Sequence, residues 1–510
     1  MEFLHVEKEN EVLSEWPLLH NGTYWDGTNL RKLVYEGKSP FRHLLDIDRL
    51  TRDLTNVVNS TFFDFIQVSG GANHYGFHIQ FLNGTEVIAR VSRGDCNDPK
   101  FFNSVREKLL KWNMAFEYST YNALSPLARE IGHLLFHRQG IKHGPRDYTI
   151  HHGVTGRSLF VFQKVKGHKY DYPHWRALNY EKKRLLLNSF ACLAGRIFHI
   201  TLSLPYVSRW LLDRIFGQDH KLDLGKVEPT RDFCIRLFNA RIHWILGQVK
   251  RERPDLETVC QSTECCLLQL VPRILPLEEV EIKECNKSDK DKEEEGDEHD
   301  KSRKGDEEEK DLKGEETGTG MREQNGGDDC EICEQRHKGY KVRGPLGKKS
   351  YKGDAFYRFV LDHGDYGIHN ATIFQDQNKT PHVTSIFDWE TGKIVPALLS
   401  EQKMIVTVDL ILDQDGEAGI ARWGDGDSEA RMDEYMDWSQ YYFGVLFNEA
   451  PSYGSVVTEG KEARVLWAAL SYPRDNIGRW LRGLSQWAAG TKAKMDKDEA
   501  WVLLGHVEQG

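Results

Sequence analysis

One short segment of the chain combines side chains that could do chemistry: residues 363–370, with the sequence HGDYGIHN. An apolar stretch precedes it, and a second apolar stretch ends at Asp388, 18 residues beyond Asn370. Phosphoryl transfer needs a carboxylate that meets the attacking hydroxyl and cations that hold the phosphate charge. Asp365 could be that carboxylate, while Asn370 and Asp388 could offer oxygen ligands to a hard metal ion. The alternative is a polar turn in which Asp and Asn only bond to the backbone.

The chain upstream of this segment is patterned as a small sheet with one helix. Two alternating runs flank the dipeptide Asn83-Gly84, which is a strong hairpin signal. The predicted strands are 62–68, 75–81, 86–91 and 158–163. From residue 179 to 275, and again at 463–470 and 477–481, apolar residues recur at helical spacing. A sheet-rich part is therefore followed by a helical part.

A strongly charged segment interrupts the helical part. Between Asn286 and Gly320 there are 15 acidic and 8 basic side chains, which accounts for most of the net charge of −10. Leu312 is the only large apolar residue there, so the segment cannot bury enough apolar surface to offset its ordering entropy. We expect residues 281–352 to be a charged, disordered insertion. A solvated loop and an acidic contact surface for a partner both fit this composition.

Composition limits the class of protein. At 510 residues the chain is too long for one ordinary core, and its 39% hydrophobic content is ample for a packed interior. The first residues lack the pattern of a secretory signal, and no stretch has the apolar length of a membrane span. Nine scattered cysteines suit reduced thiols, and no basic stripe suggests nucleic-acid binding. We therefore expect a cytoplasmic protein with neither a membrane nor a nucleic-acid partner.

The segment 363–370, together with residues 385–390 (SIFDWE), resembles the catalytic and metal-binding loops of the aminoglycoside phosphotransferase and choline kinase family, especially its fungal branch. The resemblance extends over residues 60–480 and is sharp only in these two loops. It implies an α+β fold of the bilobal, protein-kinase-like type, with a small β-rich N-terminal lobe and a larger helical C-terminal lobe. It also implies that His363 supports the catalytic loop, that Asp365 is the base, and that Asn370 and Asp388 bind Mg²⁺.

The predicted organisation has five parts. They are an N-terminal extension (1–55), a nucleotide-binding N-terminal lobe (56–166), a first part of the C-terminal lobe (167–280), the insertion (281–352), and a second part of the C-terminal lobe with both loops (353–510).

The resemblance also indicates where the phosphates of ATP would bind. Gly70 and Gly71 lie where a glycine-bearing turn would cover them, although the full GxGxxG pattern is missing. Arg90 stands on the third strand, where most kinases have Lys; Arg is a planar fork and Lys a compact point charge. We expect its carboxylate partner to be Glu130, with Glu117 as the competing candidate.

The adenine would lie along the linker that follows the strand at 158–163. Main-chain groups of Gln163 and Val165 would bond to it, and such contacts need no particular side chain.

Two weaker features remain. Cys330, Cys333 and His337 resemble half of a zinc site, but no second pair stands at the right distance, so free thiols in a loop are the simpler interpretation. An acidic run at 425–429, with Asp433, Glu434 and Asp437, could line an acceptor pocket or form a solvated helix face.

Together these features predict a phosphotransferase that uses ATP and Mg²⁺ to phosphorylate an alcohol group of a small molecule. The alternative is a catalytically inactive kinase-like binding or scaffold protein. The presence of Asp365, Asn370 and Asp388 favours the enzyme, whereas Arg90 and the incomplete glycine turn favour the alternative.

Overall fold

The computed structural model describes residues 16–19, 21–42, 44–71, 74–93, 104–139, 157–218, 220–278, 354–423, 431–471 and 476–505. Within these ranges, the side chains of residues 104–107, 110, 354 and 498–505 are not described. All the described residues belong to one unit, made of Met1–Glu278 and Tyr351–Gly510. The predicted insertion and the cysteines at 330 and 333 lie outside the described residues.

Five antiparallel strands form the N-terminal sheet, in the order β1-β2-β3-β5-β4. They are β1 (Phe62–Gly70), β2 (His74–Phe81), β3 (Glu86–Ser92), β4 (Leu134–Arg138) and β5 (Leu159–Gln163). The four strands predicted from the sequence correspond to β1, β2, β3 and β5. Gly84 in the β2–β3 turn has φ +82°, a conformation that glycine adopts without a steric cost.

The segment before this sheet contributes to the core of the sheet. It contains α1 (Leu30–Tyr35) and α2 (Ile47–Val58). The buried rings of Trp25 and Phe41 lie 5.6 Å apart, and Phe41 lies 5.5 Å from Phe77 of β2. Leu50 and Leu54 of α2 belong to the same cluster. The boundary predicted at residue 55 falls inside α2, so the described residues before it pack as part of the sheet's own core.

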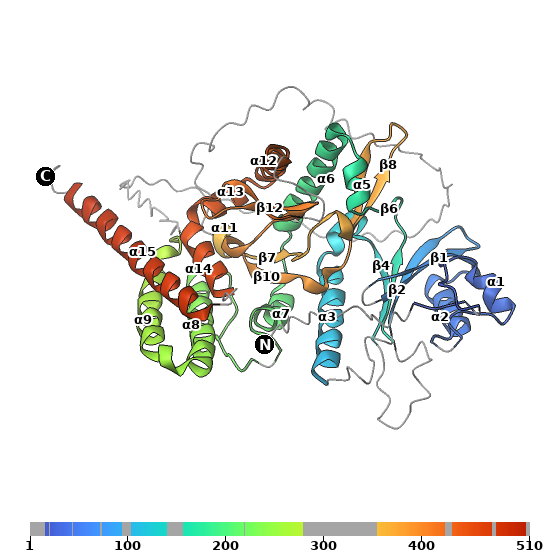
Figure 1. Cartoon of the computed structure of the whole chain (residues 1–510), viewed down its shortest axis with the longest axis horizontal. Coiled ribbons are helices and arrows are strands. Elements are labelled where there is room, and N and C mark those ends of the chain that lie inside the picture. The colour runs from blue at the N-terminus through green and yellow to red at the C-terminus, as the bar shows by residue number, and fades with distance from the viewer. Residues whose placement is uncertain are drawn as a thin grey trace, which may run out of the picture. The chain divides into compact units, whose positions relative to one another are not determined.

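Helix α3 (Ser104–Ala123) packs against both the sheet and the helical part, as Figure 1 shows. Its partner in the helical part is α7 (Leu204–Phe216), through an aromatic contact in which Phe116 and Trp210 lie 5.4 Å apart. The hydroxyl groups of Thr120 and Tyr206 are 2.8 Å apart and join the same two helices. A 3-10 turn (Ser125–Leu127) and α4 (Ala128–Ile131) then lead to β4.

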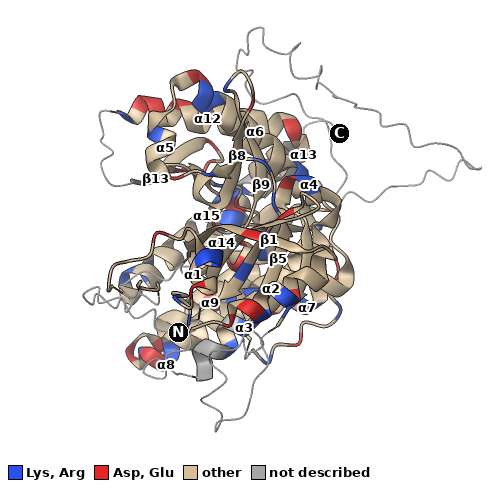
Figure 2. Cartoon of the chain, turned by 90° about the vertical axis from the view of Figure 1, so that its right-hand side faces the viewer, with Lys and Arg blue, Asp and Glu red and all other residues tan. Residues whose placement is uncertain are grey.

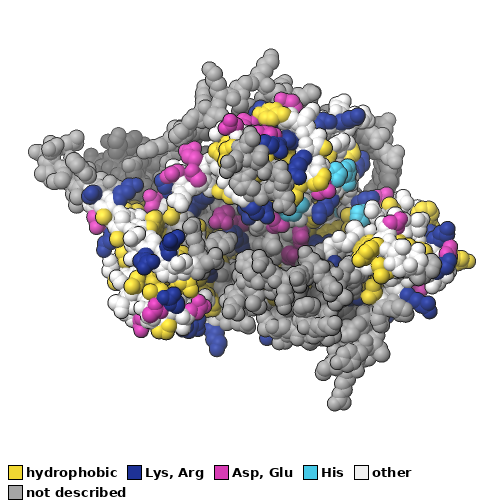
Figure 3. Space-filling model, in the orientation of Figure 1, with side chains coloured by type: hydrophobic (Ala, Val, Ile, Leu, Met, Phe, Trp, Pro, Cys, Tyr) yellow, Lys and Arg dark blue, Asp and Glu magenta, His cyan; other side chains and the backbone are white. Residues whose placement is uncertain are grey.

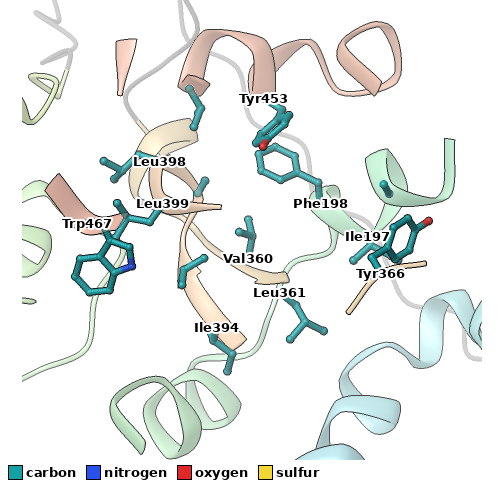
Figure 4. Packing of buried hydrophobic residues seen from close by; sticks show 14 of the residues in the cluster. Ile197, Phe198, Val360, Leu361, Tyr366, Ile394, Leu398, Leu399, Tyr453 and Trp467 are labelled. Atoms are coloured by element: carbon teal, nitrogen blue, oxygen red, sulfur yellow. The ribbon is translucent and has the colours of Figure 1, made fainter. Parts of the chain in front are cut away.

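The remaining helices form the larger hydrophobic core. They are α5 (Tyr172–Ala177), α6 (Tyr180–His199), α8 (Arg231–Glu252), α9 (Glu257–Ile274), α11 (Asp354–Tyr357), α12 (Met432–Glu449), α13 (Pro451–Glu459), α14 (Lys461–Ser471) and α15 (Ile477–Gly505). Figure 4 shows how Phe198 of α6 and Tyr453 of α13 pack near Val360, with ring centroids 4.9 Å apart for the aromatic pair. The helices predicted at 463–470 and 477–481 lie within α14 and α15.

Short antiparallel sheets lie among these helices. β7 (Phe359–Asp362) pairs with β10 (Lys393–Pro396), and β8 (Ala371–Gln375) pairs with both β6 (His168–Lys169) and β9 (Pro381–Ile386). β11 (Met404–Ile405), β12 (Val408–Leu412) and β13 (Ala418–Trp423) form the third sheet. The structure thus mixes helix and sheet, as the α+β prediction requires.

Charged residues of both signs are interspersed over helices and sheets in Figure 2. Within the described ranges, no single helix has the length and apolar character needed to cross a bilayer; α6 and α7 meet these criteria only as a pair bent by 109°.

Candidate active site

The β8–β9 hairpin brings the two predicted loops together. Ala371 of β8 is paired with Ile386 of β9, and one step beyond, the Phe387 N–H donates to the Asn370 carbonyl oxygen at 3.0 Å. The residue that follows Phe387 is Asp388, so the hairpin register sets Asp388 beside Asn370. Two predicted metal ligands that are 18 residues apart in sequence are thereby neighbours in space.

Two glycines in the segment 363–370 are required by close backbone contacts. Gly364 has φ +80°, and a Cβ atom there would lie 2.5 Å from the carbonyl oxygen of Thr391. A Cβ atom on Gly367 would lie 2.8 Å from the carbonyl oxygen of Ile405. Real Cβ atoms do not approach so closely, so the loop packs against the 389–392 turn and β11 only with glycine at these positions.

Hydrogen bonds from its own loop hold the carboxylate of Asp365. His369 Nε2 lies 3.0 Å from Oδ2, and Asn370 Nδ2 donates to the same oxygen at 2.9 Å and to the Asp365 carbonyl at 3.0 Å. The hydrogen bond from His369 is the main effect that lowers the pKa of Asp365 to about 2. The side chain is 43% exposed, and Oδ1 makes none of these bonds.

His363 links the two loops. Its ring is buried, 4.4 Å from that of Trp389, and Nε2 lies 3.0 Å from the carbonyl oxygen of Phe387. A carbonyl can only accept, so we assign the proton to Nε2. Burial lowers the pKa of His363 to about 4, which keeps the ring neutral at physiological pH. The supporting role predicted for His363 has this contact as its physical basis.

Asp388 adopts a backbone conformation that is uncommon outside glycine, with φ +72° and ψ +57°. Such strain persists only where the surroundings enforce it, and it is frequent at functional sites. Asp388 Oδ1 is buried and accepts no hydrogen bond from the described residues, although Arg90 Nη2 is 3.5 Å away. A carboxylate oxygen that accepts no hydrogen bond and lies just beyond a strand is a suitable metal ligand.

The carboxylate partner of Arg90 is Glu117, and the prediction of Glu130 is corrected here. Arg90 Nη1 donates to Glu117 Oε1 at 2.8 Å, and the Glu117 side chain is fully buried on α3. Glu130, on the short helix α4, instead pairs with Arg196 at 2.7 Å near the surface. The reason is that α3 ends at Ala123, so its buried face carries residue 117, whereas residue 130 follows a break in the helix.

The surroundings of Arg90 keep it charged. Burial opposes the charge, but the carboxylates of Glu117 and Asp388 outweigh this effect and raise the pKa of the guanidinium. His74 Nδ1 of β2 lies 3.4 Å from Arg90 Nη2, and burial together with Arg90 holds the pKa of His74 well below its usual value. A neutral His74 can accept a hydrogen bond from the arginine without competing for its positive charge.

The residues present fit a magnesium ion held jointly with phosphates. No group of three or more His, Cys, Asp or Glu side chains in the described part of the chain is arranged to hold a metal. Mg²⁺ in phosphoryl-transfer sites is usually bound by one or two protein oxygens plus the phosphates of the nucleotide. Asn370 uses its amide nitrogen on Asp365, which leaves its oxygen, and Asp388 contributes the orphaned Oδ1.

The structure describes only part of the predicted glycine turn at Gly70 and Gly71, together with the linker after β5. Gly71 at the end of β1 donates its N–H to the His74 carbonyl at 2.8 Å, and residues 72 and 73 lie outside the described residues. A Cβ atom on Gly70 would lie 3.0 Å from the Trp16 ring. In the linker, the Gln163 N–H donates to the His133 carbonyl at 2.9 Å. The Val165 N–H makes no backbone hydrogen bond to any described residue.

Two acidic residues of α12, Glu434 and Asp437, are engaged with partners. Glu434 lies 3.4 Å from Lys183 and 3.0 Å from Arg431, and Asp437 accepts a hydrogen bond from Tyr180. Residues 425–429 lie outside the described residues. The prediction of an acidic acceptor pocket therefore has little support from Glu434 and Asp437.

A cation beside the turn at 387–392 was missed in the sequence. Lys169 of β6 has its Nζ atom 5.9 Å from the centroid of the Phe387 ring, next to Asp388. Histidine and basic side chains gather on the upper right of the surface in Figure 3. A two-residue strand has no recognisable pattern, so only the pairing of β6 with β8 reveals this cation.

Comparisons with known proteins give similarity at low identity only. No protein-family model matches the chain, and no curated protein matches its sequence. Among solved structures, APH(2'')-IIa in a ternary complex with streptomycin and ATP is 9% identical, with a TM-score of 0.35, covering 87% of this chain and 97% of that chain. Aminoglycoside phosphotransferase APH(2'')-Ib with ADP is 9% identical, with a TM-score of 0.35 and coverage of 86% and 97%.

A third solved structure is macrolide 2'-phosphotransferase MphH from Brachybacterium faecium. It is 10% identical, with a TM-score of 0.31, covering 86% of this chain and 97% of that chain. TM-scores below 0.5 do not establish a shared fold. The bilobal architecture and the fungal branch therefore stay predictions from the sequence, and the assignments below depend on the residues of this chain.

Proposed function

We propose that the protein is a phosphotransferase that moves the γ-phosphoryl group of ATP to a hydroxyl group of a small molecule, with Mg²⁺ as cofactor. The observation that carries this proposal is the proximity of two groups of side chains, one around Asp365 and one around Arg90. Asp365 and Asn370 lie at the same end of the β8–β9 hairpin as Asp388, and Asp388 in turn lies 3.5 Å from Arg90. A carboxylate, two oxygen ligands and a buried cation are the parts that phosphoryl transfer requires.

Asp365 is assigned to the acceptor hydroxyl. His369 and Asn370 occupy Oδ2, so Oδ1 is the oxygen that can orient the hydroxyl group. The acceptor oxygen bonds to the γ-phosphorus as the bond from that phosphorus to the bridging oxygen of ADP breaks, and the hydroxyl proton passes to Asp365. With a pKa of about 2, Asp365 is a weak base, which suits a transition state in which the proton leaves late.

We assign nucleotide binding to the second group of side chains, which lies around Arg90. Arg90, held by Glu117, would contact the phosphates, and the turn at Gly70 and Gly71 would cover them. Main-chain groups of Gln163 and Val165 would bond to the adenine. Mg²⁺, held by Asn370 and Asp388, would neutralise charge that develops on the phosphates.

The test is a screen for magnesium-dependent formation of ADP from ATP across a panel of hydroxyl compounds that includes aminoglycosides, macrolides, amino alcohols and sugars. We expect at least one acceptor to raise ADP formation well above the rate with water, and Asp365→Asn to abolish the increase. Magnesium-dependent ATP binding without turnover on any acceptor would favour the scaffold alternative. No binding of nucleotide at all would overturn the proposal.

A further inference from the structure

The turn that follows Asp388 is held at its far end by a single arginine, Arg214 of α7. Arg214 Nε donates to the Gly392 carbonyl at 2.8 Å, and Nη2 donates to the Glu390 carbonyl at 2.7 Å. Its third nitrogen, Nη1, donates to Asn113 Oδ1 of α3 at 2.9 Å. One side chain thus ties the turn at 389–392 to two helices.

The environment of Arg214 indicates that these hydrogen bonds fix the position of the turn and do not serve mainly to pair charges. The guanidinium carbon lies 4.5 Å from the Trp112 ring centroid and 4.4 Å from that of Phe116. Burial lowers the pKa of Arg214 to about 10, so it stays charged at neutral pH. Its hydrogen-bond acceptors are two backbone carbonyls and an amide, all neutral. A planar guanidinium group packed against two aromatic rings holds its N–H donors in fixed directions. The single ammonium group of a lysine cannot do this.

Helix α3 holds the near end of the same turn. The main chain of Asp388 lies close enough to the Tyr121 hydroxyl to favour its charged form, and the main chain of Trp389 acts in the same way on the Glu117 carboxylate. A Cβ atom on Gly392 would lie 3.1 Å from the Phe116 ring, which shows how closely α3 approaches the far end. The residues of α3 involved are 113, 116, 117 and 121, which lie on one face of the helix at helical spacing.

We propose that Arg214 is a positioning residue for magnesium binding: by fixing the carbonyls of Glu390 and Gly392 against α3, it holds Asp388 in its strained conformation toward the metal and beside Arg90. This inference rests on the proposed function. Arg214 touches neither Asp388 nor the phosphates, and it acts through the turn alone. Groups that orient a metal ligand typically change metal affinity by roughly 10- to 100-fold when they are removed.

The experiment is calorimetric titration of the full-length protein with ATP, with and without Mg²⁺. The ratio of the two dissociation constants is the readout, because a purely structural role of Arg214 would leave it unchanged. For Arg214→Met, which keeps apolar contact with both rings but loses all donors, we expect ATP affinity without Mg²⁺ within about twofold of wild type and the magnesium effect reduced by about tenfold. Arg214→Lys, with one nitrogen for three acceptors, should be intermediate.

Arg358 offers a matched control. Arg358 is partly buried, as Arg214 is; its guanidinium carbon lies 4.1 Å from the Phe198 ring centroid, and it donates to the Phe198 carbonyl at 2.6 Å. Burial lowers the pKa of Arg358 to about 10 as well. Arg358→Met should lower the melting temperature and leave the magnesium effect at the wild-type value.

The outcomes separate the two proposals. A wild type whose ATP affinity ignores Mg²⁺ overturns the proposed function and, with it, the role of Arg214. A wild type that responds to Mg²⁺ while Arg214→Met responds equally overturns the role of Arg214 alone. If Arg214→Met does not fold, Arg214→Lys decides the question: an undiminished magnesium effect overturns the inference, and a reduced one supports it.

Discussion

Two regions supply the candidate site, and they are built in different ways. In the first, the segment 363–370 and the turn at 387–392, the hydrogen bonds join Asp365 to residues four and five positions away or cross a single hairpin. In the second, the corner formed by β2, β3 and α3, Arg90 meets a carboxylate 27 residues away and a histidine 16 residues away. Local spacing determines the first region, whereas helix packing determines the second.

The carboxylates of Asp365 and Glu117 also differ in exposure, and this difference separates their effects on chemistry and on stability. Asp365 is 43% exposed, so its loss leaves no buried charge behind. Glu117 is fully buried, so its loss leaves Arg90 with only the more distant Asp388. Substitution of Asp365 should therefore change turnover, whereas substitution of Glu117 should change folding as well as nucleotide binding.

The largest expected effect is on turnover, from the substitution Asp365→Asn. If Asp365 only orients and deprotonates the acceptor hydroxyl, turnover should fall on the order of 10²- to 10⁴-fold or more, with ATP affinity in Mg²⁺ within a few-fold of wild type. Asp376→Asn, at the other end of the same hairpin, is the control and should keep wild-type turnover. Retained activity in Asp365→Asn would break the distinction between the two regions.

The second prediction concerns the link between the regions, Asp388. Asp388→Ala removes a charged metal ligand, so the phosphates lose much of their charge compensation and ATP binding should lose its magnesium dependence. Calorimetric titration with and without Mg²⁺ measures this effect. Glu401→Gln, a nearby exposed carboxylate paired with Lys393, should bind ATP as the wild type does. Equal magnesium dependence in Asp388→Ala and wild type would contradict the assignment.

The third prediction compares Glu117 with Glu130, the two glutamates that the sequence analysis ranked in the wrong order. Glu117→Gln leaves a buried guanidinium without its main counter-charge, which typically costs about 3 to 5 kcal/mol of unfolding free energy. Glu130→Gln removes a near-surface pair with Arg196 and should cost roughly 0.2 to 1 kcal/mol. Urea denaturation of both variants measures the difference. Similar losses for the two would mean that Arg90 is compensated by something other than Glu117.

The same contrast explains what could be predicted from the sequence. The proximity of Asp365, Asn370 and Asp388 could be predicted from spacing, because a loop and a single hairpin are enough to bring them near one another. Glu117 was ranked below Glu130 on the family resemblance, although Ser125-Pro126 marks the break between α3 and α4. A usable signal was present: Met114 and Tyr121, three before and four after Glu117, are large apolar residues, and a carboxylate on such a face needs a buried partner.

Other contacts could not be predicted because they depend on which elements, far apart in the sequence, pack against each other. The N-terminal residues were assigned to an extension, although Ile47, Leu50 and Leu54 already recur at helical spacing and are buried against the sheet. Arg214 is one of many arginines in the sequence, and its three acceptors lie about 100 and 176 to 178 residues away. No pattern of local spacing contains such information.

The smallest expected effect is a pH dependence that arises from His363, the histidine that joins the two loops. Its pKa is about 4 in the folded protein, against 6.5 for an ordinary histidine, so between these values the unfolded chain binds the proton more readily. The corresponding stability is fully present above pH 6.5 and is lost as the pH falls toward 4. From pH 7 to pH 5 the loss attributable to His363 should be about 2 kcal/mol.

The variant His363→Gln isolates this contribution, because an amide can still donate to the Phe387 carbonyl but cannot take up a proton in this range. Urea denaturation at pH 7 and pH 5 should give a pH-dependent loss that is smaller in the variant by about 2 kcal/mol, whatever the absolute stability of each protein. Asp365, with a pKa of about 2, does not titrate between pH 5 and 7 and so does not obscure the comparison. If the wild type and the variant lose the same stability, His363 is not held neutral between the loops, and the link it makes from the catalytic segment to Asp388 must depend on other contacts.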